Sequence, residues 1–213
     1  MKDYKPIPIV EIQNAQERIK DIAIKTPLLK LNIEDAPAEI YLKLETLQSI
    51  GSFKIRGATN AIKKVKPSEL KHGVWTMSAG NHGQGVAYVA GKLGIKCIIN
   101  TPHYAAKTKV DALKRMGAEI RVRHVSNFEE FRAFFQPETY PDMEGLLVHP
   151  FSDLDVMAGQ GTIGLEIIEQ LPEVNAVLTP WGGGGLSCGV ASAIRAINPM
   201  LNYMHVNPKQ EMP

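Results

Sequence analysis

Cysteine and long apolar runs are scarce in this sequence of 213 residues, and each shortage excludes a class of protein. The two cysteines, Cys97 and Cys188, lie in apolar stretches with no second Cys or His at metal-ligand spacing. Buried free thiols in a reducing compartment are therefore expected, rather than a disulfide framework or a zinc site. No run approaches the roughly 18 apolar residues of a membrane-spanning helix, and the N-terminus lacks the apolar core of a signal peptide. We expect a soluble, cytoplasmic protein with no membrane partner.

The sequence also lacks a surplus of charge of either sign. Its 24 Lys and Arg residues against 22 Asp and Glu residues leave a formal net charge of +2. A protein that binds the phosphate backbone of nucleic acid normally carries a clustered surplus of basic residues, and no such cluster occurs here. Hydrophobic residues make up 44% of the chain, as in ordinary globular proteins. We therefore expect a globular protein whose main partner is not nucleic acid.

The hydrophobic pattern predicts helices and strands that alternate along the chain. A helix, a half-buried strand and a second helix are expected first, at 10–24, 39–45 and 51–65. From residue 73 onward, strands alternate with helices, which indicates parallel strands joined by right-handed crossovers and hence an α/β fold. The predicted strands of this part are 74–77, 95–100, 119–125, 145–149, 176–179 and 201–206, and the predicted helices are 81–93, 105–116, 127–135, 155–171 and 186–197.

The sequence stops shortly after the last predicted strand. A parallel sheet that ends on a strand leaves an edge to be paired or covered. We therefore expect the chain to be shorter than the complete fold requires. We predict two lobes: 1–72 in a large lobe, 73–147 as a small βαβ lobe, and 148–213 continuing the large lobe incompletely. A ligand is expected in the cleft between the lobes, and their relative motion could close over it.

Four consecutive glycines, Gly182, Gly183, Gly184 and Gly185, separate an apolar strand from a helix that starts near Leu186. Glycine lets the backbone approach a ligand closely, and a helix start offers free N–H groups and the positive end of the helix dipole. The pattern predicts an anion site, most naturally for phosphate, with a flexible turn as the alternative. The Gly-Lys-Ser/Thr ending of a triphosphate loop and the downstream acidic residue of a dinucleotide site are both missing. A phosphate ligand smaller than a dinucleotide is expected.

A second cluster, Ser78, Ala79, Gly80, Asn81 and His82, also lies between a predicted strand and a predicted helix. Small residues and backbone N–H groups at such a junction suit a carboxylate, and the amide of Asn81 can donate or accept. His82 is a candidate general base. No carboxylate or nucleophile is near it in sequence, however, so a helix residue held by hydrogen bonds is favoured.

The third cluster, GSFKIRGA at 51–58, contains a candidate nucleophile. Ser52 is expected to cap the following helix, which would put Lys54 in its first turn, where the helix dipole lowers the pKa of an ammonium group. A lowered pKa is what an amine nucleophile needs. Taken alone, the pattern does not distinguish Lys54 from the many lysines that are solvated surface residues.

Together and in this order, GSFKIRGA (51–58), SAGNHGQG (78–85), AGQGTIGLE (158–166) and GGGGL (182–186) resemble the fold-type-II pyridoxal-phosphate enzymes. More narrowly, they resemble the serine/threonine dehydratase and serine racemase branch, over about residues 26–199. The resemblance implies a two-lobed α/β fold like that of the tryptophan synthase β subunit, with parallel sheets flanked by helices and a truncated C-terminal part. It also implies a homodimer for the full-length protein.

The resemblance implies a role for each matching residue. Lys54 would hold pyridoxal 5'-phosphate as a covalent aldimine and later move the α-proton, with Phe53 beside the pyridine ring and Asn81 bonded to its hydroxyl. The cofactor phosphate would lie against Gly182, Gly183, Gly184, Gly185 and Leu186. The substrate carboxylate would lie against Ser78, Ala79, Gly80, Asn81 and His82.

The implied reaction is β-elimination, the dehydration and deamination of L-threonine or L-serine to a 2-oxo acid and ammonia. Racemases of this family carry a Ser-Ser-Gly-Asn-His motif. Its second serine is the acid/base on the opposite face of the substrate. Ala79 occupies that position, and its methyl group cannot donate or accept a proton. Dehydration is therefore favoured over racemisation or another β-replacement reaction. A non-catalytic protein that acts by binding is the alternative outside the enzymes, because the chain is short.

Two further expectations concern a metal site and the pocket for the substrate side chain. Metal-assisted members of the family have a Glu-Pro pair at the position where this chain has Asn207, Pro208 and Lys209. The carboxylate ligand is replaced by a neutral amide, so no metal site is expected. Phe151 is a candidate for the border of the pocket that receives the substrate side chain, although a core aromatic residue is favoured.

Overall fold

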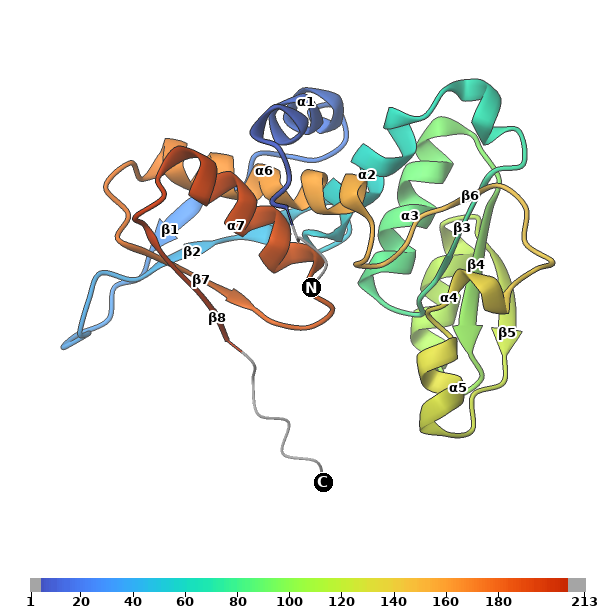
Figure 1. The fold of residues 1–213 in the computed structure, drawn as a ribbon. Helices are drawn as coiled ribbons and strands as arrows, with labels where there is room; N and C mark the ends of the chain where they lie inside the picture. Colours follow the sequence, from blue (N-terminus) through green and yellow to red (C-terminus); the bar gives the residue numbers. More distant parts are fainter. Residues whose placement is uncertain (1–4, 207–213) are drawn as a thin grey trace.

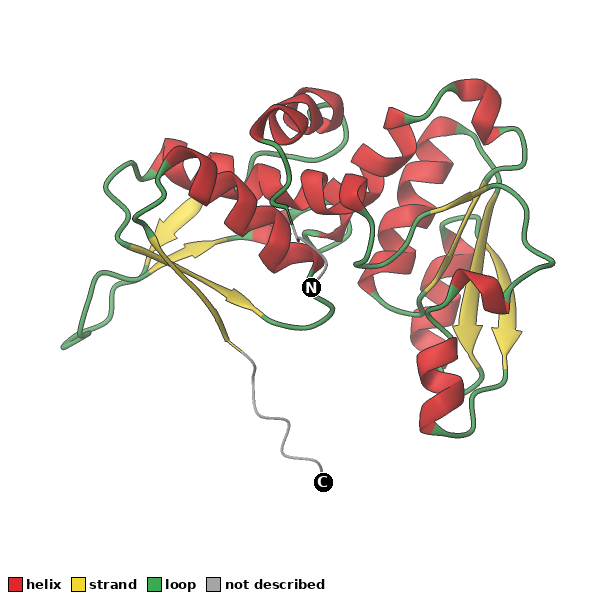
Figure 2. Cartoon of the chain, viewed as in Figure 1, coloured by secondary structure: helices red, strands yellow, loops and turns green. Residues whose placement is uncertain are grey.

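The structure, a computed structural model, describes residues 5–206, and Figure 1 shows two groups of elements side by side. One group contains a parallel sheet of four strands in the order β5-β4-β3-β6. Its strands are β3 (Val74–Met77), β4 (Cys97–Pro102), β5 (Glu119–Arg123) and β6 (Leu146–Leu147). The helices between them are α3 (Asn81–Leu93), α4 (Lys107–Arg115) and α5 (Phe128–Ala133). Figure 2 shows the alternation of strand and helix that the sequence predicts.

The second group surrounds helix α6 (Leu154–Gln170), against which helices α1 (Ile9–Ile19), α2 (Lys54–Lys64) and α7 (Gly185–Ile197) pack. Two small sheets complete this group. Strand β1 (Leu28–Lys30) pairs antiparallel with β2 (Tyr41–Lys43), and β7 (Ala176–Pro180) pairs parallel with β8 (Asn202–Val206). Short 3-10 helices occur at Glu45–Leu47, Pro67–Leu70 and Pro137–Thr139. The parallel sheets and flanking helices confirm the predicted α/β fold.

The bounds of several elements differ from the expected ones by a few residues, and two further differences have a clear physical reason. The first helix ends at Ile19 rather than at Ile24, because the side-chain amide of Gln48 bonds to both the N–H and the carbonyl of Ile24, at 3.0 and 2.8 Å. These bonds replace the ones that further helical turns would supply. Strand β1 has no counterpart among the predicted strands, since three residues are too few to show an alternating pattern.

Glycines let the helices around α6 approach closely. A Cβ at Gly159 would lie 2.6 Å from the Arg56 carbonyl oxygen on α2, and a Cβ at Gly189 of α7 would overlap the Met157 carbonyl oxygen on α6. The glycines of the AGQGTIGLE segment therefore serve helix packing. Helix α2 also packs on the other side against α3. The predicted lobe boundaries at 72/73 and 147/148 stay a prediction.

Arg56 lies at the centre of a buried cluster of charges between α2 and α6. It is 1% exposed, and its guanidinium donates to both carboxylate oxygens of Glu45 and of Glu166 at 2.6 to 2.9 Å. Lys43 contacts the same carboxylate of Glu166 at 2.6 Å. Two cations and two anions thus compensate each other where water is excluded.

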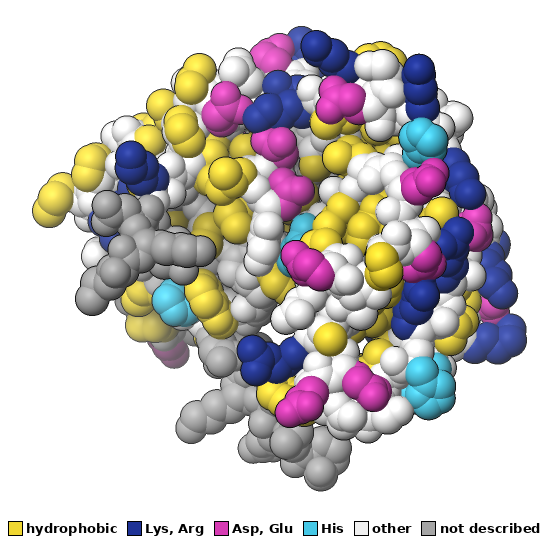
Figure 3. Space-filling view, turned by 45° about the vertical axis from the view of Figure 1, so that its right-hand side comes forward, with side chains coloured by type: hydrophobic (Ala, Val, Ile, Leu, Met, Phe, Trp, Pro, Cys, Tyr) yellow, Lys and Arg dark blue, Asp and Glu magenta, His cyan; other side chains and the backbone are white. Residues whose placement is uncertain are grey.

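Lys and Arg side chains are interspersed with Asp and Glu side chains over the face in Figure 3. Within residues 5–206, no helix is both long and apolar enough to cross a bilayer, and no cluster of three His, Cys, Asp or Glu residues is placed to hold a metal ion. Asn207, Pro208 and Lys209 lie outside the described residues.

Both cysteines are free thiols, as predicted, but they differ in exposure. Cys97 is buried in the parallel sheet, and burial raises its pKa to about 12. The expectation of a buried thiol is wrong for Cys188, which is exposed because α7 turns its neighbours Gly189 and Val190 toward the interior.

Candidate functional site

Lys54 is the first residue of α2, which confirms its predicted place in the first helical turn. The predicted cap is wrong in part. Phe53 occupies the N-cap position, while the Ser52 hydroxyl accepts the backbone N–H of Lys54 at 3.3 Å in a local turn. Burial lowers the pKa of the Lys54 ammonium from 10.5 to about 8. The expected shift is present, but its cause is loss of water around the amine rather than the helix dipole.

The Lys54 amine points to the segment that follows β6. Its Nζ donates to the carbonyl oxygen of Pro150 at 2.6 Å, and it lies 5.5 Å from the centre of the Phe53 ring. A carbonyl oxygen accepts without adding a charge, so it orients the amine and leaves its pKa low. An amine with a pKa of about 8 is half titrated at about pH 8, so a fraction of it is neutral at pH 7 and can take up a proton.

The glycine run and Lys54 border the same cavity, which has a volume of about 260 Å³. Helix α7 begins at Gly185, so its first amides have no acceptor within the helix. Gly184 has φ +85°, in the left-handed region that favours glycine. Residues lining the cavity are Phe53, Lys54, Phe151, Pro180, Trp181, Gly182, Gly183, Gly184, Gly185, Leu186 and Ser187. A buried amine with a lowered pKa and the N-terminus of a helix thus border one cavity.

Phe151 packs against the glycine run. It is partly exposed and borders the cavity rather than lying wholly in the core. A Cβ at Gly183 would overlap the Phe151 ring, and a Cβ at Gly185 would lie 2.9 Å from the Phe151 carbonyl oxygen. Close approach therefore requires glycine at both positions. Whether Phe151 also receives the substrate side chain stays a prediction.

The 78–82 loop contacts the segment after β6 that also accepts the hydrogen bond of Lys54. His82 is 2% exposed, and its Nε2 lies 2.9 Å from the Val148 carbonyl oxygen, two residues before the carbonyl that receives Lys54. Burial lowers the His82 pKa to about 3, so the ring is neutral and Nε2–H donates. The favoured interpretation of His82 as a hydrogen-bonded helix residue is confirmed, and its Nδ1 has no partner within residues 5–206.

The loop does not line the cavity. None of the residues that border the 260 Å³ cavity comes from 78–82, and Asn81 is exposed at the start of α3. Helix α3 nevertheless packs beside Lys54, since a Cβ at Gly85 would lie 3.2 Å from the Lys54 carbonyl oxygen. The structure therefore brings together Phe53, Lys54 and the glycine run, and it places the 78–82 loop next to them.

Several residues of the site have no separate signal in the sequence. Pro150 follows β6 and Pro180 ends β7, so both lie at the carboxyl ends of parallel strands. Ligands of open α/β sheets usually bind at such ends, and this position is the signal that would have found them.

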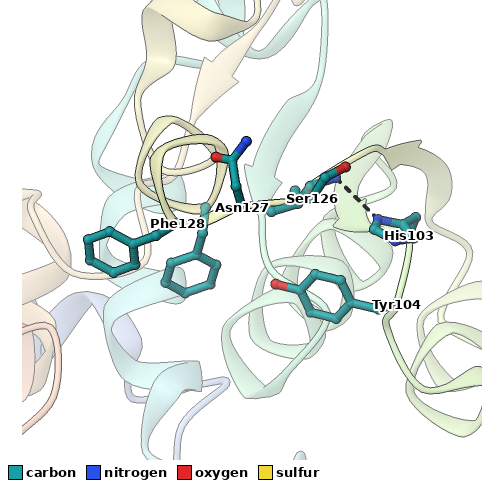
Figure 4. Close-up of a pocket in the computed structure, with 7 residues that line it drawn as sticks. His103, Tyr104, Ser126, Asn127 and Phe128 are labelled. Carbon is teal, nitrogen blue, oxygen red and sulfur yellow. Dashed lines mark hydrogen bonds between the residues drawn. The ribbon is translucent and has the colours of Figure 1, made fainter.

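A second cavity, of about 660 Å³ and wide open to solvent, lies at the carboxyl ends of β4 and β5 (Figure 4). His103 Nδ1 in its wall accepts the N–H of Val125 at 3.2 Å, and Asn127 Oδ1 caps α5 by accepting the N–H of Glu130. Aromatic rings, including Tyr104 and Phe128, form much of the rest. This wall has no lysine and no glycine run, so it does not combine the two features of the smaller cavity.

Comparison with known proteins identifies relatives over most of the chain. The family model described as "Pyridoxal-phosphate dependent enzyme" matches residues 19–213. The L-threonine ammonia-lyase of Thermotoga maritima is 42% identical over 202 residues, which are 94% of this chain and 50% of that protein. A catabolic L-threonine dehydratase of Staphylococcus aureus is 40% identical over 203 residues, 94% of this chain and 58% of that protein.

Among solved structures, maize serine racemase superposes with a TM-score of 0.89 at 35% sequence identity, covering 96% of this chain and 62% of that one. The chain thus spans only about half to two thirds of the length of these relatives.

Proposed function

The chain belongs to the fold-type-II pyridoxal-phosphate-dependent enzymes, in the threonine dehydratase and serine racemase family, and from this we propose a function. It catalyses β-elimination of L-threonine or L-serine to a 2-oxo acid and ammonia, with Lys54 as the catalytic residue. The observation that carries this proposal is the Lys54 amine, whose pKa is lowered to about 8 in a cavity shared with the start of α7.

The residues of the cavity fit pyridoxal 5'-phosphate. Its aldehyde needs an amine that is partly neutral, which Lys54 supplies, and its phosphate needs backbone N–H groups, which the start of α7 supplies. The glycine run lies so close to Phe151 that a side chain at Gly183 would displace it. The proposed holders are therefore Lys54, Phe53, Gly182 to Gly185 and Leu186, with Asn81 next to them on α3.

The proposed mechanism assigns separate tasks to this chain's residues. When bound, the cofactor supplies an aldehyde for the substrate amine and a ring that takes up the electrons of the broken Cα–H bond. Lys54 takes the α-proton at Nζ. Because Nζ donates one N–H to the Pro150 carbonyl, its lone pair stays free to accept that proton. The amides at the start of α3, in the 78–82 loop, hold the substrate carboxylate.

A second candidate function is serine racemisation, which the similarity to maize serine racemase favours. Racemisation needs a proton carrier on each face of the substrate, and Ala79 has none to offer on the face opposite Lys54. Incubation of the chain and pyridoxal phosphate with L-serine or L-threonine separates the candidates. We expect 2-oxo acid and ammonia without D-serine. D-serine as the main product would show that the chain is a racemase rather than a lyase. A folded chain that forms neither product would favour a binding role.

The lowered Lys54 pKa predicts a distinct pH dependence for the free chain. The rate of Lys54 acetylation, followed by peptide mass spectrometry, should reach half its plateau at about pH 8. Lys64 in the same sample is the internal control, because hydrogen bonds to Asp155 and Glu11 raise its pKa and its rate should still rise above pH 10.5. Equal profiles for both lysines would contradict a buried amine.

The same pKa has a consequence for stability. Below about pH 8 the Lys54 amine is protonated in the folded and the unfolded chain alike. Between about 8 and 10.5 only the unfolded chain holds that proton, so the contribution of Lys54 to the free energy of unfolding should rise with pH in this window.

Replacing Gly183 with alanine should weaken cofactor binding, because the new Cβ would overlap the Phe151 ring and push the glycine run away from its position. We expect the dissociation constant for pyridoxal phosphate, measured by absorbance titration, to rise at least about tenfold, as loss of roughly one or two hydrogen bonds would produce. Gly91→Ala on α3 is the control, since its Cβ would meet only the Met116 carbonyl oxygen at 3.5 Å. Unchanged binding by Gly183→Ala would place the phosphate elsewhere.

A further inference from the structure

The turn that follows β6 is closed by one imidazole. His149 Nδ1 accepts the backbone N–H groups of Phe151 and Ser152, at 3.2 and 2.9 Å. Its Nε2 lies 3.1 Å from the carbonyl oxygen of Phe135, near the end of α5. An amide N–H can only donate and a carbonyl can only accept, so Nδ1 is unprotonated and Nε2 carries the hydrogen. These three contacts fix one neutral tautomer of His149.

This turn holds two parts of the candidate site. The Pro150 carbonyl, inside the turn, receives the Lys54 amine at 2.6 Å. The next residue, Phe151, supports the glycine run at Gly183 and Gly185. The imidazole also meets the Phe151 ring edge-on, with 4.7 Å between ring centres. The amine and the anion-binding loop are therefore positioned by the same four-residue turn.

We propose that His149 is a positioning residue: its neutral imidazole sets the turn that orients the Lys54 amine through Pro150 and supports the glycine run through Phe151. The use of that amine rests on the proposed function, whereas the positioning itself is a property of the free chain. Burial lowers the His149 pKa below its usual 6.5, which keeps Nδ1 available as an acceptor at neutral pH. The charged groups that act on the ring are Asp153 and Lys54, and their effects on its pKa are opposite in sign.

Two amide substitutions separate the two sides of the imidazole. His149→Asn places an oxygen near the position of Nδ1 and keeps an acceptor for the Phe151 and Ser152 amides. His149→Gln places an NH₂ near the position of Nε2 and keeps only the donor to Phe135. A residue needed merely for packing would respond alike to both, whereas a residue that sets the turn needs the acceptor.

The test uses the 213-residue chain without cofactor. Hydrogen exchange of a peptide containing Phe151 and Ser152 should speed up at least tenfold in His149→Gln and less than threefold in His149→Asn, as expected when a hydrogen bond worth about 1.4 kcal/mol is lost or kept. In His149→Gln the opened turn admits water to Lys54, which raises its pKa, so Lys54 acetylation at pH 8 should slow at least threefold. His149→Asn should keep the wild-type rate.

Two results would overturn the proposal: equal behaviour of the two variants, or faster exchange throughout the chain, including the distant helix α1. If neither variant folds, the ¹⁵N shifts of His149 in the unaltered chain decide, because a protonated Nδ1 at pH 7 is incompatible with the turn. Failure of the unaltered chain to bind pyridoxal phosphate would contradict the proposed function instead and would leave these readouts intact.

Discussion

Lys54→Ala removes the proposed activity and the covalent attachment of the cofactor together. Because Lys54 is the lysine that borders the glycine-run cavity, no other amine among the described residues can replace it there. Formation of 2-oxo acid from L-threonine should fall at least about 100-fold, the usual effect of losing a general base. In the same variant, borohydride reduction after addition of pyridoxal phosphate should leave no cofactor mass on the peptide 53–60.

Lys63→Ala is the matched control for this experiment. Lys63 lies on the same helix, α2, but its side chain forms a surface ion pair with Asp21 at 2.6 Å and borders no cavity of the site. It should keep the rate and the labelling pattern of the unaltered chain. A Lys54→Ala chain that still forms 2-oxo acid at a comparable rate would show that Lys54 is not the catalytic residue.

Arg56→Met should strongly destabilise the folded chain. The guanidinium is 1% exposed and is the partner of both Glu45 and Glu166, with further bonds to Thr162 Oγ1 and the Ile24 carbonyl oxygen. Without it, Lys43 is the remaining cation beside Glu166 within residues 5–206. Breaking a buried ion pair by removing one partner costs about 3–5 kcal/mol, and we expect a loss of that size in the free energy of unfolding.

Chemical denaturation measures this loss, with Lys107→Met as the surface control. Lys107 pairs with Asp111 one helical turn away, but its side chain is 89% exposed, so its replacement should change stability by less than about 0.5 kcal/mol. Arg56→Lys should be intermediate, because an ammonium keeps the charge but cannot bond to two carboxylates in the fork of a guanidinium. Equal stability of Arg56→Met and the unaltered chain would mean that the buried cluster does not hold α2 to α6.

The parts of the fold that were predictable are those encoded within a dozen neighbouring residues. Strand β3 and helix α3 have the predicted bounds, because a short apolar strand, a small-residue turn and a helix ending before Gly94 are all local patterns. The glycine run before α7 was predictable for the same reason, and its role as an anion site stays a prediction. Its place beside Lys54 followed only from the resemblance, since 128 residues separate Lys54 from Gly182.

Contacts between distant segments explain what could not be predicted. The cause of the low Lys54 pKa is burial, and burial depends on how α2, the glycine run and the turn after β6 pack together. The role of His149 depends on the Phe135 carbonyl and on two amides of a turn that has no pattern in the sequence. Likewise, the exposure of Cys188 depends on which side of α7 faces α6.

A map of where the cofactor attaches to the unaltered chain tests the proposed role of Lys54 most directly. Pyridoxal phosphate is added at a concentration equal to that of the protein, the mixture is reduced with borohydride, and the peptides are identified by mass spectrometry. We expect one dominant labelled residue, Lys54, and loss of that label when excess inorganic phosphate competes for the start of α7. Labelling spread over surface lysines, or none at Lys54, would contradict the proposed role of Lys54.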